Sequence, residues 1–119
     1  IQQAMRQDSP EKHLRFTANI ARQIYDAEKD LIDALKTASA LEEDFKELEK
    51  EREDRRYKRL QKTIQKVVKG QYIKKKHDFL WMITGRDVYR MLVVERGWSS
   101  DEYEEWLFNT LTTMLLDIG

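Results

Sequence analysis

Residues 95–116 read ERGWSSDEYEEWLFNTLTTMLL, and they predict the end of one helix and the start of the last one. Gly97 suits the left-handed residue that commonly closes a helix, while Ser99 followed by Glu102 matches a capping box that opens one. The remaining acids fall in the first turns, where the helix dipole favours negative charge by about 0.3–1 kcal/mol each. We therefore interpret this stretch as a corner between two helices, without a catalytic or ligand-binding residue.

The last helix carries one broad apolar stripe, whose members recur at the spacing of a single helix face. The stripe consists of Tyr103, Trp106, Leu107, Thr110, Leu111, Met114 and Leu115. Phe108 lies off the stripe, and Trp98 has the spacing of a hydrophobic staple against Tyr103. These features suit a helix that packs on its own domain and on a second copy of the chain.

The segment before the corner, DFLWMITGRDVYRMLVV, indicates two further helices with little exposed surface. Thr84 and Asp87 resemble a capping box, so we expect a break at Gly85 and a new helix after it. Only Arg90 interrupts the apolar run VYRMLVV, which predicts a helix covered nearly all round. A chain of 119 residues has too few other helices to cover the whole surface of this one, and this favours a partner subunit.

The N-terminal part predicts a helix that begins at Ser9, a favoured N-cap, with Pro10 in the first helical position. Its apolar residues form two stripes: one contains Leu14, Ala18, Ala21 and Tyr25, and the other contains Phe16, Ile20 and Ile24. Two stripes cover a wide arc, so we expect this helix to pack on more than one neighbour. A bend at 26–28 then leads to a short helix over 31–38.

Residues 41–69 lack Gly and Pro and predict the longest helix, about 43 Å at 1.5 Å per residue. Acids gather in 41–54 and bases in 55–76, which favours either a basic patch for an acidic partner or a response to the helix dipole. We favour the dipole, because no aromatic interleaving or glycine-rich loop accompanies the bases. Gly70 is placed as a left-handed C-cap, with a short linker after it.

The composition narrows the classes of protein. Lys plus Arg and Asp plus Glu number 22 each, so no net field draws the chain to nucleic acid or to a membrane. Cysteine is absent, which excludes disulfides and thiol chemistry and fits the cytoplasm. No apolar run approaches the roughly 20 residues of a membrane span. We expect a cytoplasmic, all-α chain without a membrane partner.

The residues of common catalytic and metal sites do not converge in this sequence. His13 and His77 stand without metal-ligand spacing, and a solvated helix start is the favoured reading of His77. Glu104 and Glu105 are neighbours on a helix and point about 100° apart, so they do not form an acid/base pair. We expect no enzyme, no metal and no cofactor.

Four blocks in order resemble the C-terminal domain of TetR-family transcriptional regulators: SPEKHLRFTANIARQIY, DLIDALKTASA, ELEKEREDRRYKRL and DFLWMITGRDVYRMLVVERGWSSDEYEEWL. The last block is the most specific of the four. The resemblance implies a bacterial regulator whose bundle of about five to six helices dimerises through its last two helices and binds a small molecule in an apolar cavity. It also implies that 1–8 end a linker helix from an upstream DNA-binding domain, and that 9–119 form the regulatory domain.

Two sets of candidate residues follow from this resemblance and from the apolar stripes. The ligand-binding candidates are Phe16, Ile20, Ile24, Tyr57, Leu60, Ile64, Trp81, Met82 and Tyr89. The dimer-interface candidates are Val88, Met91, Leu92, Tyr103, Trp106, Thr110, Leu111, Met114 and Leu115. DNA would be contacted only through the upstream domain. The alternative function is a helical adaptor that binds another macromolecule through the charged 41–69 helix.

Overall fold

The computed structural model describes residues 9–68 and 72–116, and this part of the chain is helical with no strand. In chain order the elements are α2 (Pro10–Glu28), the 3₁₀ turn η1 (Lys29–Leu31), α3 (Ile32–Leu41), α4 (Glu43–Val67), α5 (Lys74–Ile83), α6 (Arg86–Tyr89), the π-helix η2 (Arg90–Glu95) and α7 (Ser100–Leu115). The predicted all-α class is confirmed. The predicted linker end at 1–8 and the predicted cap at Gly70 lie outside the described residues.

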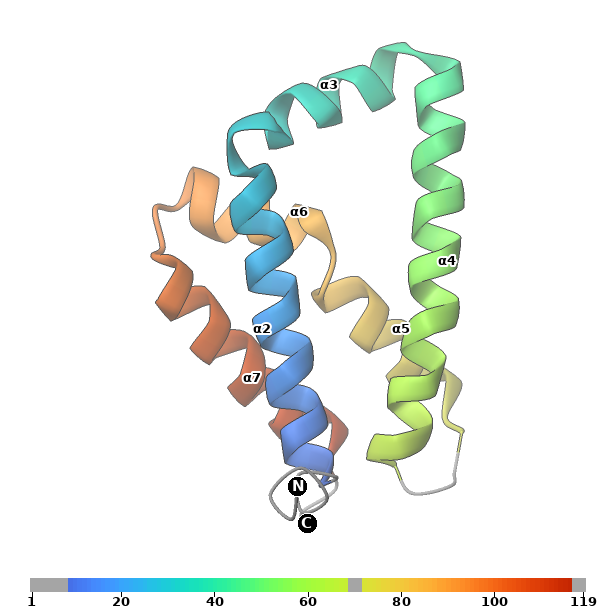
Figure 1. Ribbon diagram of the computed structural model, residues 1–119, viewed down its shortest axis with the longest axis vertical. Helices are drawn as coiled ribbons and strands as arrows, with labels where there is room; N and C mark the ends of the chain where they lie inside the picture. The colour runs from blue at the N-terminus through green and yellow to red at the C-terminus, as the bar shows by residue number, and fades with distance from the viewer. Residues whose placement is uncertain (1–8, 69–71, 117–119) are drawn as a thin grey trace.

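Helix α2 runs through the middle of the molecule (Figure 1). It packs against α7 on one side and approaches α4 on the other, while α3 bridges the far ends of α2 and α4. Helix α5 packs on α4 and also contacts α7. As a result, α2, α3 and α4 form three sides of a frame, and α5 and α6 lie behind it.

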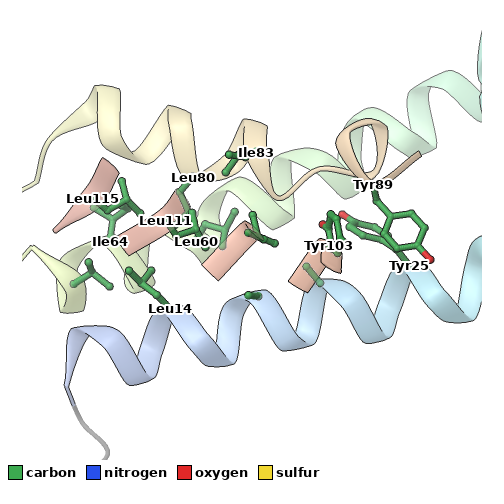
Figure 2. Packing of buried hydrophobic residues seen from close by; sticks show 14 of the residues in the cluster. Leu14, Tyr25, Leu60, Ile64, Leu80, Ile83, Tyr89, Tyr103, Leu111 and Leu115 are labelled. Carbon is green, nitrogen blue, oxygen red and sulfur yellow. The ribbon is translucent and has the colours of Figure 1, made fainter. Parts of the chain in front are cut away.

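The hydrophobic core lies where α2, α4, α5 and α7 meet (Figure 2). Each of these helices contributes a fully buried aliphatic residue: Leu14 from α2, Ile64 from α4, Leu80 from α5 and Leu111 from α7. Burying one such side chain contributes about 1.5–3 kcal/mol relative to leaving it exposed. The first apolar stripe of α2 is the one that faces this core, since all four of its members are buried.

The predicted helix boundaries at Ser9 and at the 95–116 corner are confirmed. The Ser9 side chain accepts a hydrogen bond from the Lys12 backbone N–H, with Pro10 following it. Gly97 has a φ of +78°, and the Trp98 N–H donates back to the Leu92 carbonyl at 3.0 Å, which closes the preceding helix.

The capping box of α7 is present with both of its hydrogen bonds. The Ser99 side chain accepts from the Glu102 N–H, and the Glu102 carboxylate accepts from the Ser99 N–H. The staple partner differs from the prediction: Trp98 lies edge-on to Trp106, with ring centroids 5.8 Å apart, while Tyr103 packs edge-on against Tyr89. The tryptophan at the corner therefore packs one turn further along α7 than predicted.

Two predicted boundaries were wrong. The long helix begins at Glu43 and not at residue 41, because Glu42 has extended backbone angles that separate α3 from α4. Thr84 does not cap the helix after the break: Gly85 is its N-cap, and the Thr84 hydroxyl donates instead to the Leu80 carbonyl at 2.6 Å. A threonine at a helix end can bond backward to the preceding turn, and here that bond outcompetes the forward cap.

The helix after the break is only partly covered within one chain, and the predicted cover by a partner subunit stays a prediction. Tyr89, Arg90 and Val93 are buried, whereas Met91 is 44% exposed and Leu92 is half-buried. Its second part is the π-helix η2, in which the Arg96 N–H donates to the Met91 carbonyl at 3.1 Å. The apolar run thus leaves exposed surface that the single chain does not cover.

Candidate functional site

The second apolar stripe of α2 faces a groove between α2 and α4. Phe16 is 65% exposed and Ile24 is 41% exposed, so no helix of the described chain packs fully on this face. The groove has a volume of about 190 Å³. Its lining residues are Phe16, Thr17, Ile20, Ala21, Ile24, Tyr25, Arg56, Arg59, Leu60, Thr63 and Thr84. We call this site the α2–α4 groove.

Arg56 forms part of the groove wall and is held by several partners. Its guanidinium donates to Glu53 at 2.6 and 3.0 Å, to the Thr84 hydroxyl at 2.8 Å and to the Trp81 carbonyl at 2.9 Å. The guanidinium also passes close to Gly85, where an added Cβ would lie 3.3 Å from Nη2. Every nitrogen of Arg56 is therefore engaged, and the side chain fixes α4 to the break between α5 and α6.

Tyr25 gives the groove a buried polar end. Its hydroxyl donates to the Thr84 carbonyl at 2.8 Å, and burial raises the pKa of the phenol above its usual range. The Tyr25 ring also packs at an angle on Tyr89, with centroids 5.5 Å apart. Helix α2 is thereby joined to the α5–α6 break through one side chain.

A second site lies on the other side of α4, between α4 and α5. This cleft has a volume of about 900 Å³ and is lined by Glu53, Asp54, Tyr57, Lys74, Lys75, Asp78, Phe79, Trp81 and Met82. Tyr57 and Trp81 meet edge to face with centroids 6.2 Å apart, and Met82 is 53% exposed. We call this site the α4–α5 cleft.

His77 stands behind the α4–α5 cleft and is 1% exposed, so its predicted position at a solvated helix start was wrong. Its Nε2 lies 2.8 Å from the Tyr57 carbonyl, which can only accept, so Nε2 carries the proton. Nδ1 lies 3.0 Å from the Tyr72 hydroxyl, which donates to it in the neutral imidazole. The imidazole also stacks on the Tyr57 ring at 3.7 Å. The spacing of apolar residues along one helix could not predict the contact between Tyr57 and His77, because these residues are on different helices.

The Tyr57 hydroxyl is aligned by a carboxylate at the cleft wall. It donates to Asp78 at 2.5 Å, and Lys74 donates to the other oxygen of Asp78 at 2.7 Å. The hydrogen bond to Asp78 raises the pKa of Tyr57, and Lys74 together with Tyr57 holds the pKa of Asp78 below its usual value. The phenol proton is thus already donated to Asp78, so the Tyr57 hydroxyl can only accept a hydrogen bond from a ligand in the cleft.

The structure separates the nine ligand-binding candidates into three groups. Phe16, Ile20, Ile24 and Leu60 line the α2–α4 groove. Tyr57, Trp81 and Met82 line the α4–α5 cleft on the opposite side of α4. Ile64 and Tyr89 are fully buried in the core and line neither site. Trp81 and Met82 also line a third cleft, of about 510 Å³, which reaches α3. The nine candidates therefore do not line one common cavity.

The nine dimer-interface candidates also divide by exposure. Tyr103, Leu111 and Leu115 are buried by their own chain, to 0%, 0% and 1% exposure, so a partner could not reach their side chains. Met91 and Met114 are exposed, at 44% and 55%. The remaining four candidates, Val88, Leu92, Trp106 and Thr110, are half-buried. Val88 and Met91 also line a cleft of about 510 Å³ that reaches Ile32 and Leu35.

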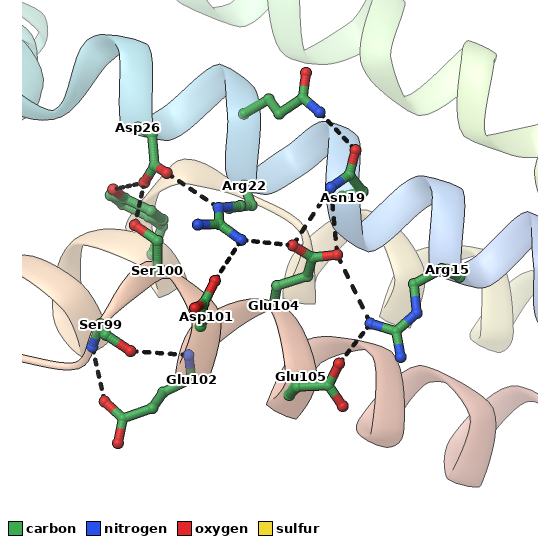
Figure 3. A network of polar contacts seen from close by, with 12 residues as sticks. Arg15, Asn19, Arg22, Asp26, Ser99, Ser100, Asp101, Glu102, Glu104 and Glu105 are labelled. Carbon is green, nitrogen blue, oxygen red and sulfur yellow. Dashed lines mark hydrogen bonds and ion pairs between the residues drawn. The ribbon is translucent and has the colours of Figure 1, made fainter.

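The acids of the 95–116 corner join α7 to α2 in addition to lying at a helix start (Figure 3). Glu104 accepts from Arg22 at 2.9 Å and from Asn19 at 3.3 and 3.4 Å, with a further ion pair to Arg15 at 3.7 Å. The Glu104 side chain is only 12% exposed within this network. The sequence interpretation missed these partners because Arg15, Asn19 and Arg22 precede Glu104 by more than 80 residues.

Asp26 lies at the upper end of the same helix pair. Its carboxylate accepts from the Tyr89 hydroxyl at 2.5 Å and the Ser100 hydroxyl at 2.7 Å. Burial opposes ionisation, but the hydrogen bonds from Tyr89, Ser100 and Arg22 together hold the pKa of Asp26 below its usual value. Asp26 therefore connects three helices through its charged form.

The described residues contain no group of three or more His, Cys, Asp or Glu side chains arranged to hold a metal ion. None of the described helices combines the length and apolar character needed to cross a bilayer. The chain matches no family model, no curated protein and no solved structure among known proteins.

Proposed function

We propose that this chain is the effector-binding and dimerisation domain of a TetR-like transcriptional regulator. A small apolar or amphipathic ligand would bind in the α2–α4 groove and alter operator affinity by moving α2. The observation that carries the proposal is the uncovered apolar face of α2, where Phe16 and Ile24 remain exposed beside α4. Exposed apolar side chains in a concave site are the usual signature of a binding site.

The position of α2 makes it suitable as a lever. One face of the helix is fixed to α7 by the ion pairs of Arg15 and Arg22, while the other face borders the groove. A ligand between α2 and α4 would favour one separation of these helices over another. The start of α2 at Ser9 would transmit that change toward an upstream DNA-reading domain, and a coupling of about 1–3 kcal/mol changes operator affinity some 5- to 150-fold.

Homodimerisation is part of this proposal, because two DNA-reading domains must match half-sites about one helical turn apart. The exposed and half-buried candidates on η2 and α7 supply the interface: Met91, Leu92, Trp106, Thr110 and Met114. Light scattering at micromolar concentration should give the mass of two chains. The mass of a single chain under these conditions would refute homodimerisation.

The decisive test is whether this chain belongs to a longer protein with a DNA-binding domain. A reading frame upstream of Ile1 that encodes roughly 50 to 70 residues with helix-turn-helix character would support the proposal. The protein encoded by that frame should then bind an operator with an affinity that a ligand of the α2–α4 groove changes. Equal operator affinity with and without a bound ligand would refute an effector role.

A helical adaptor is the second candidate function, and the exposed bases of α4 favour it. Arg55, Lys58, Lys62 and Lys66 are exposed, and within residues 9–68 and 72–116 none of them takes part in an ion pair. An adaptor would bind an acidic partner through these bases, with an affinity that falls steeply as salt increases. If the chain is a regulator domain, residues 1–119 alone should not bind DNA. Measuring DNA binding by this chain at increasing salt concentration therefore separates the two candidates.

A further inference from the structure

We infer that the α2–α4 groove selects an anionic amphiphile, such as a medium-chain carboxylate, whose acid group binds Arg59 and whose alkyl chain covers Phe16, Ile20 and Ile24. This inference rests on the proposed effector role of the groove and specifies the chemical class of its ligand. It follows from three properties of the described lining: the charges that are present, the partners that these charges have, and the length and volume of the apolar surface.

The charges that line the groove are of one sign. Arg56 and Arg59 are its charged lining residues, and none of the described side chains that line it is a carboxylate. The outer face of α4 beside the groove adds Arg55, Lys58 and Lys62, all exposed. A concave apolar surface bordered by charges of one sign concentrates ligands of the opposite sign. The groove therefore favours an anion over a cation with the same apolar part.

The two arginines differ in what they can still bind. Arg56 already donates four hydrogen bonds to Glu53, Thr84 and Trp81, so it cannot hold a carboxylate through two hydrogen bonds without losing one of them. Arg59 is exposed, and no hydrogen bond or ion pair engages it within the described residues. A guanidinium can hold a carboxylate through two parallel hydrogen bonds. Arg59 is accordingly the residue that would bind the acid group.

The apolar surface of the groove runs along α2, while Arg59 lies on the α4 wall. Phe16, Ile20 and Ile24 follow one another at four-residue spacing, and the stretch from the first to the last covers about 12 Å at 1.5 Å per residue. The volume of about 190 Å³ lies below the range of about 300–1,000 Å³ typical for drug-sized ligands. A single unbranched alkyl chain fits these dimensions better than a fused-ring ligand.

The test measures binding of decanoate, decanol and decylamine to the purified chain by isothermal titration calorimetry, below the concentrations at which they form micelles. Decanoate should bind most tightly, and octanoate and hexanoate should follow with a loss of about two- to fourfold per CH₂ removed. Decylamine binding as tightly as decanoate would overturn the inference.

Matched variants locate the acid group. R59Q should weaken decanoate binding by about three- to tenfold and leave decanol binding unchanged. R55Q is the control, since Arg55 is an exposed base one turn earlier on α4 that does not line the groove, and it should change decanoate binding less than twofold. Equal effects of R59Q and R55Q would show that the charge acts only at long range and would refute a bound carboxylate at Arg59.

A third variant separates this inference from the proposed effector role. F16S removes apolar surface at a side chain that is 65% exposed, so circular dichroism should show an unchanged helical fold. F16S should weaken the binding of both decanoate and decanol. If decanol binds as tightly as decanoate and F16S abolishes both, the groove binds apolar ligands but does not select anions, so the effector role stands and this inference falls. If neither ligand binds, both fall for this groove.

Discussion

Replacing Glu104 by Gln tests whether the acids of the 95–116 corner hold two helices together or only complement a helix dipole. Glu104 is 12% exposed and receives hydrogen bonds from Arg22 and Asn19, with Arg15 nearby. Gln has nearly the same shape and can still accept a hydrogen bond, so the substitution removes mainly the charge. Among the described residues, Arg22 then keeps only Asp26 and the exposed Asp101 as ionic partners.

The expected loss follows from the burial of the network. Hydrogen bonds to charged groups contribute about 1.5–3 kcal/mol when protected from water, while exposed ion pairs contribute about 0.2–1 kcal/mol. Glu104 is mostly buried but its partner Arg22 is 29% exposed, so we expect a decrease of about 1–2 kcal/mol in the free energy of unfolding. For a chain of this length, that decrease lowers Tm by about 3–6 °C for each kcal/mol.

Urea denaturation followed by circular dichroism measures this decrease directly. The matched control is E105Q, since Glu105 is 61% exposed and contacts only Arg15 among the described residues. We expect E105Q to lose less than about 0.5 kcal/mol. A dipole effect alone fades beyond the first turn, so it would make E102Q more harmful than E104Q. Equal stability of E104Q and E105Q would refute the α2–α7 network as a stabilising feature.

Three further predictions concern the corner, the Asp26 carboxylate and the two faces of α7. Gly97→Ala should cost about 1–2 kcal/mol in unfolding free energy, because the φ of +78° is strained for alanine although the added Cβ meets no atom within 4 Å. Asp26 has a lowered pKa in the folded state, so its stabilisation is present above the unfolded value of about 3.9 and is lost as pH falls through the folded pKa; urea titrations should show less acid sensitivity in D26N. Leu111→Ala should cost about 2–5 kcal/mol, whereas Met114→Ala, at a 55% exposed position, should leave the monomer fold intact and weaken the dimer measured by light scattering. Leu111→Ala unfolding at the same denaturant concentration as Met114→Ala would contradict the core placement of Leu111.

Local signals in the sequence were sufficient for the helix boundaries that depend on neighbouring residues. The Ser9–Pro10 start, the Gly97 stop and the Ser99–Glu102 capping box each involve contacts within a few residues, and all three are present. The predicted cap at Thr84 was wrong, although it also depends on neighbouring residues. The Thr84 hydroxyl can bond forward to the next helix or back to the preceding turn, and it donates to the Leu80 carbonyl of the preceding turn.

The site could be predicted only in part, because residues far apart in the chain determine it. The periodicity of α2 revealed a second apolar stripe but not that the stripe would face a groove. Tyr57 and Phe16 were both expected at a ligand, yet Tyr57 lines the α4–α5 cleft and Phe16 lines the α2–α4 groove. His77 and Glu104 were assigned to solvent or to a helix dipole because their partners lie on other helices.

The frame formed by α2, α3 and α4 has a weak connection at its top. Among the residues of α3, Ile32 alone is buried, so packing holds that helix loosely. The upper ends of α2 and α4 are instead joined through Arg86, which donates to Glu28 and Glu49 at 3.1 Å each, and through the pair of Arg52 with Glu28. The side chains of Arg86, Glu28 and Glu49 are only 16–25% exposed, so salt screens these ion pairs less than it screens surface pairs. The separation of the two groove walls should therefore depend on these three side chains more than on the ionic strength of the cell or the buffer.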